Sequence, residues 1–216
     1  MDFGQLLVFI MELIGTVAFS ASGAMVAIEK SMDIFGVCVL GVCTAVGGGM
    51  VRDIILGNVP DALTDPVYVA VAAATALMVF LVLYMRKEHL HGRSRAFYDS
   101  LMLIMDAVGL GIFTGVGVLT GIRAGYPNNE FLLVFLGTIT GVGGGLLRDM
   151  MAGVPPYIFV KHIYALASIA GACIFVLLYK FFGEVPALVV SSILIIAIRL
   201  LAAHYHWNLP RLKILR

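Results

Sequence analysis

The residues of this chain that could do chemistry lie in two copies of one short motif. Each copy is 14 residues long, begins with three glycines, continues to an adjacent arginine and aspartate, and ends at a proline. Both copies lie in apolar stretches, where hydrocarbon strongly disfavours charge and where glycine weakens a helix. The copies therefore mark where the function lies: Gly47, Gly48, Gly49, Arg52, Asp53 and Pro60 in the first, Gly143, Gly144, Gly145, Arg148, Asp149 and Pro156 in the second.

Motifs of soluble enzymes do not explain these residues. The segment 141–145 imitates part of a dinucleotide-binding fingerprint, but it lies inside an apolar run and not in a βαβ unit. The sequence has no Walker lysine, zinc-protease helix or nucleophile elbow. Its three cysteines lack metal-ligand spacing. We therefore expect no enzyme, no cofactor, no nucleic-acid partner and no metal beyond transient monovalent cations.

The composition predicts an all-α membrane protein. Hydrophobic residues make up 61% of the 216 residues and charged residues only 12%. Apolar runs of about 20 residues, long enough to cross a bilayer core of about 30 Å, recur along nearly the whole chain. We expect a single transmembrane domain, 1–216, that passes the cell inner (plasma) membrane seven times, at about 5–27, 34–57, 66–85, 101–121, 130–152, 158–179 and 185–204.

Basic residues predict the orientation of these spans. Seven spans place the loops alternately on two sides of the membrane. One side receives nine lysines and arginines, and the other receives only Arg123 and Lys180. Because basic loops stay in the cytoplasm, we expect an external N-terminus and a cytoplasmic C-terminus. The nine are Lys30, Arg86, Lys87, Arg93, Arg95, Lys161, Arg211, Lys213 and Arg216.

The doubled motif extends into a duplication of the whole chain. The copies align at an offset of 96 residues, and upstream of them Glu12 aligns with Asp106 and Phe19 with Phe113 at an offset of 94. Repeat one (about 5–85) and repeat two (about 99–179) therefore hold three spans each, and an extra helix follows at about 185–204. Since three is odd, the second repeat enters the membrane upside down. Inverted repeats are common in transporters, with the site near the midplane.

The glycine triplets have two compatible interpretations. Three glycines in mid-span favour a break or kink, which would present backbone carbonyls to a permeant. Small residues spaced four apart, such as Gly41, Ala45 and Gly49, are also typical of close helix packing. Hydroxyls near the span centres either replace ion hydration or bond to the carbonyl four residues earlier. These hydroxyls belong to Ser20, Thr44, Thr114 and Thr140.

The charges within the spans need partners or water. Adjacent residues project about 100° apart on a helix, so we expect Arg52 and Asp53 not to pair well with each other. We expect Arg52 to meet Glu12 and Arg148 to meet Asp106. Such pairs either only lock helices together or line two vestibules, in which Asp53 and Asp149 attract cations. A third arginine within a span is Arg199.

Taken together, the doubled G-G-G-x-x-R-D, the seven spans and the inverted repeats resemble the prokaryotic trimeric intracellular cation (TRIC) channels. They are equally similar to the bacterial inner-membrane branch described as glycine transporters. The resemblance implies a homotrimer in membrane lipid, with an hourglass pore for monovalent cations, chiefly potassium, in each protomer. Glycine-kinked spans two and five would line that pore, with residues 47–49, 52, 53, 143–145, 148 and 149.

Three hypotheses follow. The leading one is a passive channel for monovalent cations. The alternative is a small-solute (glycine) transporter that uses the same midplane site; the sequence does not separate the two, because both need a broken helix at an inverted-repeat interface. The third is a membrane scaffold in which every buried charge only locks helices.

Overall fold

The computed structural model describes residues 3–86, 93–160 and 163–207. These residues form helices and turns and no strand. Several basic residues on which the predicted orientation depends, among them Lys87, Lys161 and Arg211, lie outside the described residues. The helices are α1 (Phe3–Glu29), α2 (Ile34–Ile55), α3 (Asp61–Thr64), α4 (Val67–Arg86), α5 (Arg93–Arg123), α6 (Glu130–Met151), α7 (Tyr157–Val160), α8 (Ala165–Phe182) and α9 (Glu184–His204).

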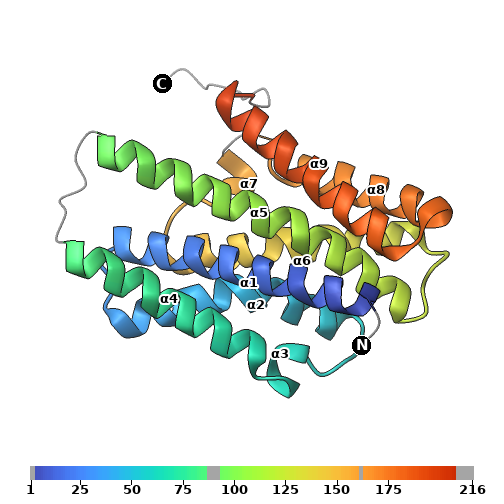
Figure 1. The fold of residues 1–216 in the computed structure, drawn as a ribbon, viewed down its shortest axis with the longest axis horizontal. Helices are drawn as coiled ribbons and strands as arrows, with labels where there is room; N and C mark the ends of the chain where they lie inside the picture. The colour runs from blue at the N-terminus through green and yellow to red at the C-terminus, as the bar shows by residue number, and fades with distance from the viewer. Residues whose placement is uncertain (1–2, 87–92, 161–162, 208–216) are drawn as a thin grey trace, which may run out of the picture.

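Seven of these helices are long and apolar enough to cross a membrane, which confirms the predicted number of spans. The prediction was wrong for the start of the sixth span. It begins at Ala165 and not near residue 158. The residues that follow Pro155 and Pro156 form a separate short helix, α7, ahead of the spanning helix α8. The long helices lie side by side along one direction, and the short helices α3 and α7 lie at opposite ends of the bundle (Figure 1).

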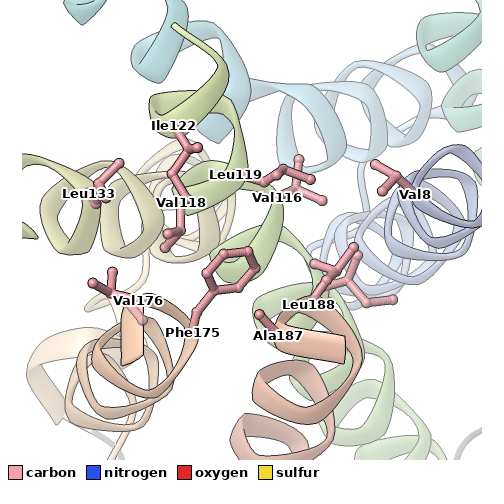
Figure 2. Packing of buried hydrophobic residues seen from close by; sticks show 12 residues of the cluster. Val8, Val116, Val118, Leu119, Ile122, Leu133, Phe175, Val176, Ala187 and Leu188 are labelled. Atoms are coloured by element: carbon pink, nitrogen blue, oxygen red, sulfur yellow. The ribbon is translucent and has the colours of Figure 1, made fainter. Parts of the chain in front are cut away.

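Helix α5 occupies the centre of the bundle. It contacts α1, α6, α8 and α9. Helix α4 packs against α1 and α2, on the side of the bundle away from α8 and α9 (Figure 1). Phe175 of α8 fills the space between α5, α8 and α9 and is fully buried (Figure 2). Large apolar side chains elsewhere face outward, as expected of a surface in contact with lipid. The extra helix α9 is thus part of the core and not an appendage.

Corresponding residues of the two repeats touch each other reciprocally where α1 and α5 cross. A methyl group at Gly15 would meet the ring of Phe113 at 3.1 Å, and one at Gly109 would overlap the ring of Phe19. The two phenylalanine rings themselves lie 5.4 Å apart. Such a reciprocal contact, in which Gly15 meets Phe113 and Gly109 meets Phe19, is the kind that a two-fold axis produces.

Candidate functional site

The doubled motif builds the same helix end twice. Gly57 after α2 and Gly153 after α6 have left-handed φ angles of 75° and 67°. The next amides return to the helix, with Asn58 N donating to the Asp53 carbonyl at 2.9 Å and Val154 N donating to the Asp149 carbonyl at 3.0 Å. This is the Schellman arrangement, in which glycine has no Cβ to strain. It fixes where the last helical turn, which carries Arg and Asp, stops.

Each motif aspartate accepts two hydrogen bonds, one from the preceding arginine and one from the backbone of a short helix. Asp53 Oδ2 accepts a hydrogen bond from the Asp61 amide at 3.0 Å, and its Oδ1 accepts one from Arg52 Nε at 2.7 Å. In the second copy the Tyr157 amide donates to Asp149 Oδ2 at 2.8 Å. Arg148 Nε donates to Asp149 Oδ1 at 2.8 Å. The proline that ends each motif directly precedes a short helix, α3 or α7, and the aspartate accepts a hydrogen bond from the first amide of that helix.

The expectation that adjacent arginine and aspartate do not pair was therefore wrong. Although their Cβ atoms diverge, the arginine side chain is long enough to turn back toward its neighbour. Arg52 does not pair with Glu12; it pairs with Asp53 at 2.6 Å and with Asp61 at 3.5 Å. Glu12 instead accepts a hydrogen bond of 2.5 Å from the Tyr68 hydroxyl.

Of the break or kink expected at the glycine triplets, the break does not occur. Helices α2 and α6 run without interruption through Gly47–Gly49 and Gly143–Gly145. The triplets instead let the two backbones touch. A methyl group at Gly48 would overlap the Thr140 carbonyl oxygen, and one at Gly144 would overlap the Thr44 carbonyl oxygen. This reciprocal contact is the close packing that small residues permit.

The predicted hydroxyls are all hydrogen-bonded, two within their own helix and two to another helix. Thr44 and Thr140 each donate to the carbonyl four residues earlier, at 2.6 Å in both cases. Ser20 donates to the Ala72 carbonyl at 2.6 Å, and Thr114 and Ser168 share a hydrogen bond of 2.7 Å. All four predicted hydroxyl residues are buried.

A cavity of about 70 Å³ lies at the Arg52 end of the contact between α2 and α6. Besides Arg52 and Asp53, its charged lining residues are Glu12 and Asp61. Gly49, of the first triplet, also lines it. The cavity has room for a few water molecules. Three carboxylates and one guanidinium give this end an excess of negative charge.

A second cavity lies at the other end of the bundle. Its volume is about 340 Å³, and Asp149, Glu29 and Lys30 supply its charged lining residues. Tyr157, held by Asp149, also lines it. Each motif aspartate therefore borders one cavity, and the glycine contact lies between the two Arg-Asp pairs along α2 and α6.

Arg148 lies in a buried cluster of charges. The expected pair with Asp106 forms at 2.7 Å, and both side chains are 1% exposed. Arg148 Nη1 also donates to the Ser22 hydroxyl at 2.6 Å. Two further members of the cluster were not predicted as partners of Asp106: Tyr164, whose hydroxyl donates to Asp106 Oδ1 at 3.4 Å, and Arg199, whose Nη2 lies 3.7 Å from Asp106 Oδ2. The signal for Arg199 was present, since an arginine within a span requires a partner.

Comparison with known proteins identifies the family. The family model described as "Glycine transporter" matches residues 9–84 and 103–180. The inner membrane protein YadS of Escherichia coli is 36% identical over 95% of this chain and 96% of its own length. The chain belongs to this glycine transporter family. The membrane protein YvgT of Bacillus subtilis is 31% identical over 93% of this chain and 94% of its own length.

Solved structures similar to this member of the family are TRIC channels. One TRIC cation channel is 34% identical, with a TM-score of 0.83 and complete coverage of both chains. A prokaryotic TRIC channel crystallised in 0.5 M KCl is 29% identical, with a TM-score of 0.84 over 95% of this chain and all of its own. These relatives are channels or transporters, and the predicted seven-span fold and inner-membrane location are confirmed.

Proposed function

We propose that this protein is a passive channel for monovalent cations, chiefly potassium, with an hourglass pore inside each protomer. The observation that carries the proposal is the pair of carboxylate-lined cavities at opposite ends of the bundle, bordered by Asp53 and Asp149. Between these cavities α2 and α6 touch at glycines, which have no side chain that a passing ion would have to displace. Similarity to TRIC cation channels supports the same conclusion.

The excess negative charge of the first cavity favours cations over anions. Glu12, Asp53 and Asp61 outnumber Arg52 there, and a low-dielectric wall concentrates their field. We propose that Gly47–Gly49 and Gly143–Gly145 form the narrowest part and that both arginines restrict passage. The buried hydroxyls of Ser20, Thr44, Thr114 and Thr140 would flank this part. Because Gly48 and Thr140 touch, conduction requires α2 and α6 to separate or bend at the triplets.

The architecture of the channel is proposed on similar grounds. The reciprocal contacts of Gly15 with Phe113 and of Gly109 with Phe19 support two inverted repeats, about 5–85 and 99–179, followed by the extra helix. The excess of basic residues on one side supports an external N-terminus and a cytoplasmic C-terminus. The similar protein from Rhodobacter sphaeroides is a trimeric channel orthologue, and we propose that this chain forms a homotrimer in the lipid bilayer.

Purified protein in a planar lipid bilayer tests this function. A potassium chloride gradient should give unitary currents whose reversal potential lies near that of potassium. A matched preparation of the variant Asp53→Asn/Asp149→Asn, which removes one carboxylate from each cavity, should show weaker cation preference. Wild-type protein that remains silent at all voltages, while eluting as a single folded species, would refute the channel.

A second candidate function is transport of a small zwitterion such as glycine. The favouring observation is that one cavity presents both a guanidinium, Arg52, and carboxylates, Glu12 and Asp61. A zwitterion needs opposite charges at its two ends. The description of the matching family model agrees with it. Saturable uptake of labelled glycine into proteoliposomes, competed by unlabelled glycine, would support a transporter, whereas non-saturable uptake without competition would exclude it.

A further inference from the structure

Asp106 lies between two buried arginines from different helices. Its Oδ1 pairs with Arg148 Nη1 at 2.7 Å, and its Oδ2 lies 3.7 Å from Arg199 Nη2. All three side chains are 1% exposed. Arg148 belongs to the doubled motif, whereas Arg199 comes from α9, outside the duplication. One carboxylate therefore has a close cation and a second cation slightly beyond hydrogen-bond distance.

The second cation is incompletely bonded. Within the described part of the chain, Arg199 Nε and Nη1 and Asp106 Oδ2 are buried without a hydrogen-bond partner, as is Arg148 Nη2. Arg199 is held over the ring of Tyr164, with its Cζ 4.5 Å from the ring centroid. A planar guanidinium stacked on a ring can slide without losing that contact. Unsatisfied buried donors beside an unsatisfied acceptor favour a movement that joins them.

The first repeat is built differently at the corresponding position. Both carboxylates accept a hydrogen bond from a tyrosine hydroxyl, Glu12 from Tyr68 and Asp106 from Tyr164, but only Glu12 is half-buried and borders a cavity. Water can reach Glu12 when its neighbours move. Asp106 borders neither cavity that we describe, so it needs a protein cation whenever Arg148 leaves it.

We propose that Arg199 is a positioning residue for gating: it moves to hydrogen-bond distance of Asp106 Oδ2 when Arg148 leaves Asp106 Oδ1 as α2 and α6 separate. This inference rests on the proposed channel. Without Arg199, opening would leave the buried Asp106 carboxylate with the Tyr164 hydroxyl but with no cation, which is strongly disfavoured. Arg199 thereby stabilises the open state without lining the pore, and its loss should change how often the channel opens and not how much current each opening carries.

Single-channel recording in planar bilayers tests this role. Arg199→Gln should lower the open probability by about tenfold or more at unchanged unitary conductance, because Arg148 still pairs with Asp106 in the closed state but not in the open one. Arg199→Lys keeps the charge and should restore most of the openings. The control is Arg123→Gln, an arginine that also pairs with a residue of α9, Glu184, but at the surface; its open probability should match the wild type.

The outcomes separate this inference from the proposed function. Wild-type protein without currents refutes the channel itself. A conducting Arg199→Gln variant with wild-type open probability refutes the positioning role, even if the variant unfolds at a lower temperature. If Arg199→Gln does not fold, the double variant Asp106→Asn/Arg199→Gln decides, because it buries no unpaired carboxylate at residue 106. It should open at least as often as the wild type, and fewer openings would overturn the inference.

Discussion

Replacing Gly48 by alanine tests the backbone contact between α2 and α6 at the glycine triplets. The new methyl group would overlap the carbonyl oxygen of Thr140, which is backbone and cannot turn aside as a flexible side chain can. Gly49 provides a matched control in the same triplet. The nearest atom to a methyl group there is Arg52 Nη2, at 3.8 Å. The two variants therefore make the same chemical change in the same helix and differ only in the contact.

Two contributions to the free energy of unfolding act in opposite directions. Alanine stabilises a helix interior by about 1 kcal/mol relative to glycine, and both variants gain this. Overpacking costs about 1–3 kcal/mol, with backbone contacts at the upper end, and only Gly48→Ala incurs it. The free energies of unfolding should thus differ by about 2–3 kcal/mol. For a chain of this size, that separates the two midpoint temperatures by roughly 4–12 °C.

Thermal unfolding in detergent, followed by the monodisperse peak on size exclusion after heating, measures this difference. Gly144→Ala should resemble Gly48→Ala, because its methyl group would overlap the Thr44 carbonyl oxygen. Equal midpoints for Gly48→Ala and Gly49→Ala, or a more stable Gly48→Ala, would show that α2 and α6 are not in backbone contact at the triplets.

Further predictions concern the charged residues. Arg148→Gln should lower stability by about 3–5 kcal/mol, seen as loss of the folded peak, because it removes the nearest cation of two buried carboxylates, Asp106 at 2.7 Å and Asp149 at 2.8 Å. Arg52→Gln should cost less, about 1–3 kcal/mol, since its second partner, Asp61, has a side chain 71% exposed; equal losses would contradict this ranking. Asp149→Asn should lower the cation-to-anion permeability ratio about twofold or more, measured from reversal potentials. Unchanged selectivity would assign Asp149 to structure alone.

The sequence alone predicts the elements of this fold well. The number of spans follows from the lengths of the apolar runs, because a helix that crosses the bilayer needs about 20 apolar residues and helices of soluble proteins rarely have such long runs. The pair of Arg148 with Asp106 was also predictable, since two charges in adjacent spans of one repeat must compensate each other. Spacing pointed to Gly41, Ala45 and Gly49 as a packing seam, whereas the backbone contact between α2 and α6 is made one position earlier than Gly49, at Gly48, and likewise at Gly144.

The sequence predicts side-chain reach and local capping less well. The angle between Arg52 and Asp53 on a helical wheel ignores the length of the arginine, which allows it to turn back. The bond from Asp53 to the amide of Asp61 depends on a tight turn at Gly57, which apolar periodicity does not reveal. Helix propensity likewise suggested a break at the triplets. Tertiary contact between two glycine faces outweighs that propensity, because it buries backbone against backbone.

The two ends of the bundle are electrostatically unequal. Arg148 is enclosed with Asp106 and, through α9, with Arg199, whereas Arg52 faces a cavity and the exposed Asp61. A duplicated protein with identical halves would pass current equally in both directions. In the proposed channel, an ion entering from one face of the bilayer would meet Arg52, beside a cavity, and an ion entering from the other face would meet Arg148, which is held in the buried cluster. We therefore expect rectification, with its direction set by α9, the helix that carries Arg199.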